Sequence, residues 1–461
     1  MKKFINTFLI IVLVGSLFSC SKSDLNPTLA QNKDVGTSIN TQEDIQGLLY
    51  GAYDRMTHYY YYGRDYIIYG EVRTDNCFSN GNSGRFVTVG AMQMLPTSGY
   101  ATNTWTQMYR VIGNANIIIA QDPAKLTGDQ KAIKNIIGQA YAIRALAHFD
   151  LLKLYGEENV TGGNNVGIPY ITEFKGNNIL PKRNTVDEVK TAIQADLTKA
   201  LSLMDPALND YAKRETISTY AVNALQSRVA LYFGDYATAK TAAEAVINSG
   251  KYSIAAPADY ANTWIAKGTA NVIFELAERP TDNQNINGLS QIYRGNAYGD
   301  IQALEDILTI FDPTDVRVQA NMIGYENGIL RNIGKYPTNA NFDYDIPLIR
   351  YEEVVLNYAE ALFQLGDNAG ALAQLNSITA QRNATAYTAA TEANILKERR
   401  RELCFEGFRF DDLARTHRDI PLVAPLQQTM GTVKYGDYNY AFPIPQAEID
   451  ANSNMTQNKG Y

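Results

Sequence analysis

The stretch DIPLIRYEEVVLNYAEALFQLGDNAGALAQLNSITAQRNA, residues 345–384, carries the strongest structural signal in this chain. Its apolar residues recur with the period of an α-helix, at Val354, Val355, Tyr358, Ala359, Leu362 and Phe363. Gly366 and Asp367 interrupt the pattern before a second helix begins near Ala369, so the stretch predicts a helical hairpin. One hairpin cannot bury its own apolar face, and we therefore expect others to stack against it.

Other segments repeat this organisation. ALYFGDYATAKTAAEAVI, which begins at Ala230, follows the same order as ALFQLGDNAGALAQLNSI, which begins at Ala361: an Ala-Leu pair, an aromatic residue, Gly-Asp and an alanine-rich helix. A third long helical pattern, KNIIGQAYAIRALAHFDLLKLYG, ends at Gly156. The pattern predicts an all-α fold with a tetratricopeptide-like α-superhelical body, whose helical hairpins lie around residues 128–155, 186–249 and 348–382.

The region 251–341 departs from this helical pattern. It is rich in Asn, Gly and Tyr, and NVIFELA, from Asn271, has the composition of a short strand. We interpret 251–341 as a loop-rich insertion within one domain, residues 41–461. The domain should therefore combine a helical body with long irregular loops and a few short strands.

The beginning of the chain has the features of an export signal. Lys2 and Lys3 precede an apolar run that is too short to span a membrane and that ends at Cys20. A cysteine at the cleavage position is typical of a bacterial lipobox, so we predict a lipoprotein signal peptide at 1–19 and lipidation, including palmitate, at Cys20. A polar tether over 20–40 would then hold the domain on a membrane surface. The alternative is an ordinary secretory signal in which the cysteine is incidental.

Composition excludes one large class of function. The chain carries 41 basic and 48 acidic residues, and loss of Lys2 and Lys3 with the signal makes it more acidic still. Nucleic-acid binding needs a basic face, and none stands out. Beyond Cys20, only Cys77 and Cys404 remain, and their different contexts favour two free thiols over a disulfide.

Six segments occur in a distinctive order along the chain. They are EDIQGLLYGAYDRM, WTQMYRVIGNANIII, GQAYAIRALAHFDLLKLYG, IPLIRYEEVVLNYAEAL, LKERRRELCFEGFRFDDLAR and FPIPQAEIDANSNMTQNKGY. Together they resemble the SusD/RagB family of Bacteroidetes outer-membrane nutrient-binding lipoproteins, over nearly the whole mature chain. The resemblance implies a non-catalytic protein of the cell surface. It also implies a partner, a SusC-like TonB-dependent transporter whose barrel such a protein covers like a lid.

A run of tyrosines follows the first helix of the domain. Six tyrosines lie between Tyr59 and Tyr69 in HYYYYGRDYIIY. Four adjacent tyrosines cannot all face a core, so some must lie exposed or line a groove, where their rings can stack on a sugar. Our candidates are Tyr61 and Tyr62. Packing of the run at a helix-to-loop junction is the competing interpretation.

Two polar regions supply the other candidate ligand-binding residues. The resemblance implies that the loops after the first helix form part of the ligand surface, which selects Arg73, Asn76, Arg85 and Tyr100. In the segment 279–300, aromatic rings, a planar donor and an amide suit saccharide recognition, which selects Tyr293, Arg294, Asn296 and Tyr298. A solvated loop is the alternative for this segment.

Catalytic and metal chemistry find little support in the residues. The segment 283–288 resembles the start of a calcium loop but lacks the acidic ligands at its first and twelfth positions. The histidines are scattered, and we predict no metal, no cofactor and no catalytic residue. Glu398, Glu402 and Glu406 lie on one helix with arginines three residues away, which favours structural ion pairs over a glycosidase pair.

The sequence thus predicts a surface protein that binds an oligosaccharide or polysaccharide and delivers it to a transporter for import. Three alternatives remain at this point. The same type of complex could bind a peptide or protein fragment, the chain could be a hydrolase, or it could be a pure interaction scaffold with no small ligand.

Overall fold

The computed structural model of this chain describes residues 39–176, 179–295, 298–338, 341–425, 427 and 433–461. The predicted signal peptide, Cys20 and nearly all of the predicted tether lie outside the described residues. Within the described part of the chain, no helix is both long and apolar enough to cross a membrane.

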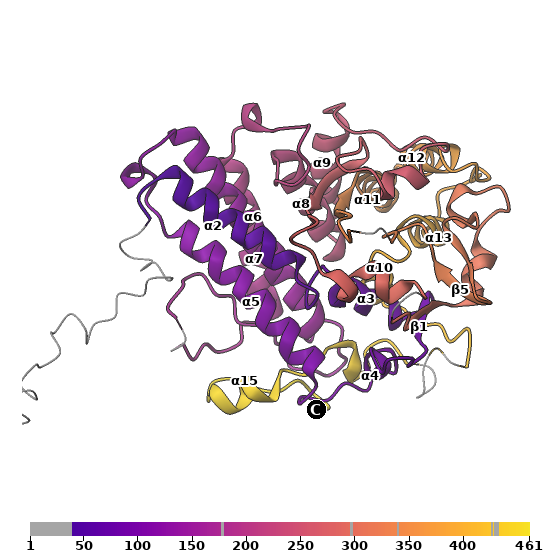
Figure 1. Cartoon of the computed structure of the whole chain (residues 1–461), viewed down its shortest axis with the longest axis horizontal. Helices are drawn as coiled ribbons and strands as arrows, with labels where there is room; N and C mark the ends of the chain where they lie inside the picture. Colours follow the sequence, from indigo (N-terminus) through magenta and orange to yellow (C-terminus); the bar gives the residue numbers. More distant parts are fainter. Residues whose placement is uncertain (1–38, 177–178, 296–297, 339–340, 426, 428–432) are drawn as a thin grey trace, which may run out of the picture.

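Four long helices form one side of the molecule (Figure 1). They are α2 (Gln42–Thr57), α5 (Gly99–Ile119), α6 (Gln130–Tyr155) and α7 (Val186–Leu203). Capping boxes start two of them: the side chains of Thr41 and Asp44 cap α2, and those of Thr185 and Glu188 cap α7. α6 packs against both α5 and α7, and α2 packs along α5.

Helical pairs form the adjoining part of the body. They are α8 (Thr219–Tyr232) with α9 (Tyr236–Ile247), and α11 (Tyr351–Gln364) with α12 (Asn368–Ala380), followed by α13 (Glu392–Leu403). Ala230 of α8, Ala239 of α9 and Ala361 of α11 share one buried cluster. Because alanine lacks a long side chain, these helices can approach closely, and the predicted mainly helical fold is confirmed.

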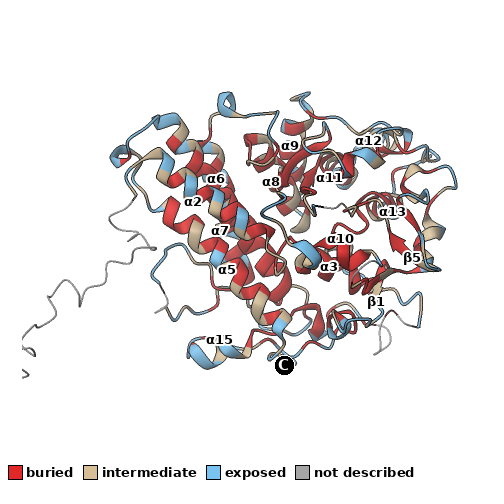
Figure 2. Cartoon of the chain, viewed as in Figure 1, coloured by how far each residue is buried: buried red, intermediate tan, exposed pale blue. Residues whose placement is uncertain are grey.

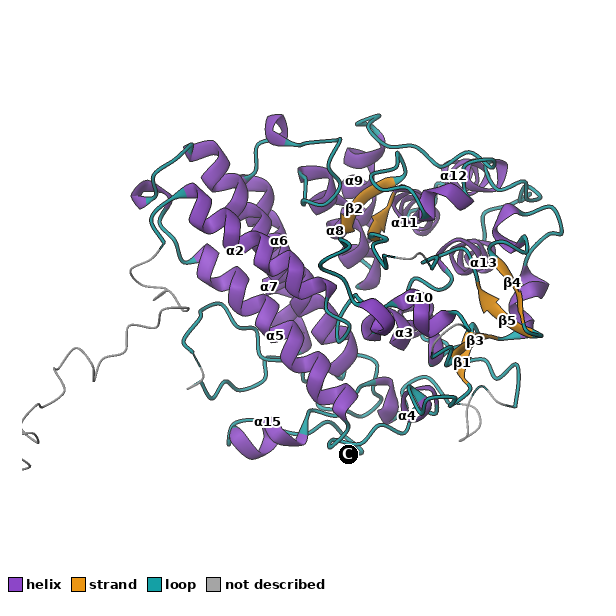
Figure 3. Cartoon of the chain, viewed as in Figure 1, coloured by secondary structure: helices purple, strands orange, loops and turns teal. Residues whose placement is uncertain are grey.

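The rest of the domain is irregular and carries short helices and strands (Figure 3). The short helices are α3 (Asp65–Val72), α4 (Val87–Gly90), α10 (Leu289–Tyr293), α14 (Arg409–Arg415) and α15 (Gln446–Ala451). The strands pair antiparallel as β1 (Cys77–Ser79) with β3 (Ile301–Ala303), β2 (Val272–Leu276) with β6 (Ile346–Arg350), and β4 (Ile323–Glu326) with β5 (Ile329–Asn332). The strand predicted in NVIFELA is β2. Cys77 and Cys404 are both buried and free, as predicted.

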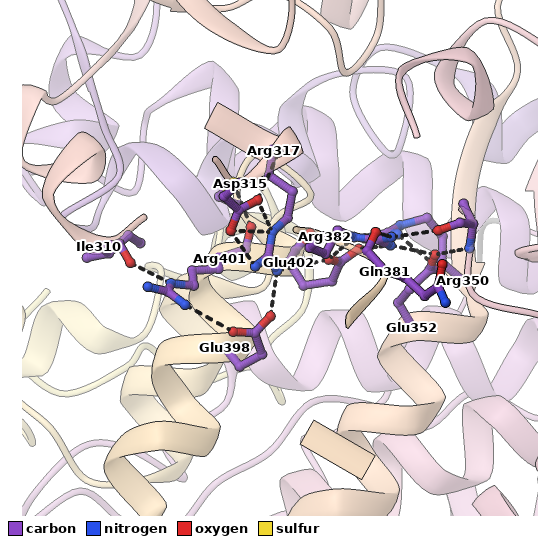
Figure 4. A network of polar contacts seen from close by, with 12 residues as sticks. Ile310, Asp315, Arg317, Arg350, Glu352, Gln381, Arg382, Glu398, Arg401 and Glu402 are labelled. Atoms are coloured by element: carbon purple, nitrogen blue, oxygen red, sulfur yellow. Dashed lines mark hydrogen bonds and ion pairs between the residues drawn. The ribbon is translucent and has the colours of Figure 1, made fainter. Parts of the chain in front are cut away.

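Much of the region where the insertion meets the helical pairs is buried (Figure 2), and a network of charged side chains lies within it (Figure 4). Glu402, on α13, is fully buried and pairs with three guanidinium groups. Its carboxylate lies 2.9 Å from Arg350 Nη1, 2.9 Å from Arg382 Nε and 3.1 Å from Arg317 Nη1. These arginines come from β6, from the end of α12 and from the insertion, so one carboxylate joins three segments that are distant in sequence.

The ion pairs along α13 differ from those that residue spacing predicted. Arg401 does pair with Glu398 within the helix, at 3.5 Å. Arg399, however, binds the carboxylate of Asp412 at 3.0 Å, and Arg409 binds that of Asp75 at 2.7 Å. A spacing of three residues would pair Arg399 with Glu402 and Arg409 with Glu406, but carboxylates from other elements bind both guanidinium groups. The expectation that Glu406 lies on the same helix as Glu402 is wrong, because α13 ends at Leu403.

Candidate functional site

The tyrosine run lies on a tight reversal between α2 and α3. α2 ends at Thr57, and the backbone turns back through residues 58–64 before α3 begins. Gly63 is required in this turn, because a Cβ there would overlap the carbonyl oxygen of Thr57. The reversal separates the run into two pairs: Tyr61 and Tyr62 face inward and are buried, whereas Tyr59 and Tyr60 face outward and are half-buried.

The inward tyrosines are structural. Tyr61 and Tyr62 are 0% and 4% exposed, and their hydroxyls donate to Asp150 Oδ2 at 2.6 and 2.5 Å. Tyr66 donates to the other oxygen of the same carboxylate at 2.6 Å. The prediction that Tyr61 and Tyr62 contact ligand is therefore wrong, because both rings are packed in the core and both hydroxyls are already used.

The outward tyrosines line an open groove of about 410 Å³. Tyr59 and Tyr60 form one part of its wall, and the first turn of α5 forms another. The other lining residues come from the loop before α4, α4 itself, the residue before α3 and the turn before α10. The full set is Tyr59, Tyr60, Arg64, Arg85, Thr88, Ser98, Gly99, Tyr100, Asn103 and Asn287. The groove therefore combines three tyrosine rings with guanidinium, hydroxyl and amide groups.

The two outward rings support each other. Their centroids lie 4.3 Å apart with an interplanar angle of 57°, and His58 stacks on Tyr59 at 4.4 Å. The hydrogen bond with Tyr59, followed by burial, raises the pKa of Tyr60 to about 12. The Tyr60 hydroxyl is therefore protonated throughout the physiological range. The Arg64 guanidinium carbon also lies over the Tyr59 ring, 5.0 Å from its centroid.

Arg85 and Tyr100 are the predicted site residues that the fold does bring together. The Tyr100 hydroxyl accepts a hydrogen bond of 2.9 Å from the backbone N–H of Phe86, whose ring stacks on that of Tyr100 at 5.0 Å. Phe86 has the left-handed φ of 59°. This backbone conformation turns the chain at Arg85, whose side chain reaches the groove.

Tyr298 also belongs to this region, through Arg85. The Arg85 guanidinium carbon lies 3.5 Å from the centroid of the Tyr298 ring, a cation–π contact that fixes the plane of the guanidinium. Asn82 Nδ2 donates to the Tyr298 backbone oxygen at 2.8 Å. The segment 80–85 and the segment 298–300 are thereby joined beside the groove, although they are far apart in sequence.

Four of the remaining predicted residues have structural contacts elsewhere. Arg73, Asn76 and Tyr293 are 2%, 0% and 1% exposed, so the prediction that they contact ligand is wrong. Asn76 bonds Glu71 and Arg400, Tyr293 donates to the Phe405 carbonyl, and Arg73 stacks between two phenylalanines. Arg294 binds Glu326 at 2.5 Å and does not line the groove. Asn296 lies outside the described residues.

Most of the residues that line the groove were not predicted from the sequence. Tyr59 and Tyr60 belong to the tyrosine run, and their position directly after the end of α2 is a local signal that distinguishes them from Tyr61 and Tyr62. Asn103 lies one turn into α5, where the polar loop ends. Arg64 and Asn287 carried no local signal, because only the tertiary fold places them together.

The groove shows no catalytic constellation. No Asp or Glu lines it, whereas a glycosidase needs two carboxyl groups across the cleft. Within the described part of the chain, no three His, Cys, Asp or Glu side chains are placed to hold a metal ion. The arrangement suits binding through ring faces and hydrogen bonds.

Two family models match consecutive parts of this chain. Residues 24–231 match the family described as starch-binding and associating with the outer membrane, and residues 269–461 match the SusD family. The chain belongs to the SusD/RagB family. The resemblance seen in the helical segments is confirmed, and both halves of this SusD-like chain are covered.

Individual relatives agree with the family assignment. A SusD-like protein of Formosa agariphila is 26% identical over 92% of this chain and 94% of its own length. The starch-binding protein SusD of Bacteroides thetaiotaomicron is 34% identical over 138 residues, which is 28% of this chain and 24% of that protein. Among solved structures, a SusD superfamily protein of Bacteroides vulgatus is 27% identical with a TM-score of 0.83, covering 92% of this chain and 100% of that chain.

Proposed function

We propose that this SusD-like chain binds an oligosaccharide or polysaccharide in the groove walled by Tyr59, Tyr60 and Tyr100. The observation that supports this most strongly is the pair of outward rings beside guanidinium and amide groups. A ring face packs on the C–H face of a sugar, while hydroxyl, guanidinium and amide groups satisfy the sugar hydroxyls. The starch-binding relative makes a glycan the first ligand class to test.

The groove also bears on the size of the ligand. Its volume of about 410 Å³ lies within the range of ordinary small-ligand sites, so a few sugar units fit while the rest of a longer chain extends into solvent. An open groove loses little water on binding, and we therefore expect modest affinity and ready release. Such behaviour suits a protein that captures a nutrient and passes it on.

Delivery would require a partner and a membrane anchor. We propose that lipid on Cys20 holds the chain at the outer membrane and that a SusC-like TonB-dependent transporter receives the glycan. The family description of outer-membrane association supports this location. Co-purification of the chain with a transporter barrel from detergent-solubilised outer membranes tests the partnership, and its absence under conditions that keep other such complexes intact would count against it.

Replacement of both outward tyrosines tests the groove directly. For the variant Tyr59→Ala with Tyr60→Ala, we expect affinity for the bound glycan to fall by roughly ten- to a hundredfold, because each ring contributes about 0.5–1.5 kcal/mol beyond its buried area. A panel of glycans and peptides is screened by affinity electrophoresis, and calorimetry then measures affinity for each glycan that is retarded.

The matched control is Tyr325→Ala. Tyr325 is 59% exposed on β4, outside the groove lining, and its hydroxyl bonds Glu305. This variant should bind as the native chain does. Equal glycan affinity in the double variant and the native chain would refute the groove assignment. If the native chain bound peptides but none of the glycans in the panel, the peptide-binding alternative would replace the proposed function.

A further inference from the structure

The groove is positively charged on a protein that is acidic as a whole. The chain has a formal net charge of −7, yet the only charged residues that line the groove in the described part of the chain are Arg64 and Arg85. Neutral-sugar recognition benefits from carboxylates, which accept hydrogen bonds from sugar hydroxyls in pairs. Because no carboxylate lines the groove, its charged groups are hydrogen-bond donors with positive charge.

The two guanidinium groups differ in how far their charge is compensated. Arg64 is buried, and its Nε binds Asp65 Oδ1 at 2.7 Å, so a carboxylate behind the wall neutralises it. Arg85 is half-buried, and within the described residues it forms no ion pair. Its Nη1 donates to Ser83 Oγ at 2.6 Å, and Ser83 in turn donates to Asp300. Arg85 is therefore the groove guanidinium that has no direct carboxylate partner among the described residues, although the charge of Asp65 also acts on it.

The contacts of Arg85 leave its planar fork in a defined orientation. The Tyr298 ring covers one face of the guanidinium, and Ser83 holds one of its terminal nitrogens. The same fork geometry matches the two oxygens of a carboxylate or the oxygens of a sulfate ester. An arginine that is already oriented loses less conformational freedom when it binds such a group.

The first turn of α5 adds to the positive character. Ser98, Gly99, Tyr100 and Asn103 line the groove, so the amino-terminal end of a 21-residue helix faces it, and no acidic residue occupies that first turn. The N-terminal end of a helix carries a partial positive charge that favours anions. Burial lowers the pKa of His58, and the charges of Arg110, Arg64 and Arg55 lower it further.

We propose that the natural ligand is an acidic glycan and that Arg85 binds its carboxylate or sulfate group while Tyr59 and Tyr60 stack on the sugar rings. This inference rests on the proposed function and narrows it to one class of saccharide. Arg85 is then the specificity-determining residue of the groove. The tyrosine rings would serve neutral and charged sugars alike, whereas the guanidinium distinguishes them.

Matched glycan pairs test this on the full mature chain, purified in detergent. One pair is an oligogalacturonate and its methyl ester, in which a neutral ester group replaces each carboxylate. The other is a sulfated galactan oligosaccharide and its desulfated form. Calorimetry at low ionic strength should show at least one charged member binding about ten- to a hundredfold more tightly than its neutral counterpart, the range expected for a hydrogen bond between charged groups. The pair that shows the preference identifies carboxylate or sulfate as the recognised group.

Arg85→Gln should abolish this preference, and Arg85→Lys should restore only part of it, because lysine keeps the charge but lacks the fork. Arg418→Gln is the matched control, since Arg418 is exposed and pairs with Glu392 away from the groove. The inference is overturned if Arg85→Gln leaves the preference intact. It is also overturned if only neutral glycans bind in a manner that needs Tyr59 and Tyr60, in which case the proposed function stands. Absence of binding to every glycan overturns both.

Discussion

Glu402→Gln is expected to lower the free energy of unfolding by about 3–5 kcal/mol, the range for removing one partner from a buried ion pair. The fully buried carboxylate binds Arg317, Arg350 and Arg382, which come from different segments of the chain (Figure 4). Glutamine keeps the size of the side chain but removes its charge, so three buried guanidinium groups lose their shared counter-charge. Chemical denaturation monitored by circular dichroism measures the change.

The pH dependence of stability provides an independent check on Glu402. Burial opposes ionisation of this carboxyl, but Arg382, Arg350 and Arg317 outweigh it and hold its pKa well below the usual range. Because the pKa is lower in the folded state, this carboxylate stabilises the fold above the unfolded-state pKa of about 4.5 and loses that contribution as the pH falls. The difference between the native chain and Glu402→Gln should therefore shrink toward acid pH.

Glu392→Gln is the matched control for Glu402→Gln. Glu392 also lies on α13, but its ion pair with Arg418 is exposed on both sides, so the change should cost less than about 1 kcal/mol. If Glu402→Gln proves as mild as the control, the buried network contributes little to stability. That result would contradict the role assigned to it here.

Gly70→Ala is expected to destabilise the protein by about 3 kcal/mol or more, or to prevent folding. A Cβ on Gly70 would overlap the backbone of Gly407, which itself has a left-handed φ of 89°. Because the overlap is between the new Cβ and backbone atoms, no flexible side chain can rearrange to relieve it. α3 would therefore have to move as a unit. Thermal unfolding and the yield of folded protein measure the effect.

The effect of Gly70→Ala should extend to the groove. α3 begins at Asp65, directly after Arg64, so a displaced α3 also displaces the groove wall that carries this arginine. Any folded fraction of Gly70→Ala should therefore bind glycan more weakly than the native chain does.

Gly47→Ala is the matched helical control. Gly47 is exposed on α2, and a Cβ there meets no atom within 4 Å. Alanine is favoured over glycine in a helix interior, so this variant should gain roughly 0.5–1 kcal/mol. A Gly70→Ala variant with native stability would mean that α3 and the 405–408 turn are not packed as closely as described.

The helical body was predictable because its signals are local. The apolar period from Val354 to Leu362 and the break at Gly366 and Asp367 specify α11, the turn and α12 without reference to the rest of the chain. The same holds for the capping box at Thr185, which starts α7. Arg85 and Tyr100, which were selected from the loops to which they belong, both line the groove, and their contact with a ligand stays a prediction.

Which tyrosines face the groove was decided only by the tertiary structure. A turn has no period from which side-chain direction can be read, and here the direction depends on Gly63 fitting against Thr57 and on a carboxylate at Asp150, 88 positions beyond Tyr62. The ion-pair partners of Arg399 and Arg409 were also decided by the tertiary structure, because the carboxylates that bind them come from other segments. Local sequence thus specifies the helices and their pairing, whereas contacts between distant segments determine which side chains remain available to bind a ligand.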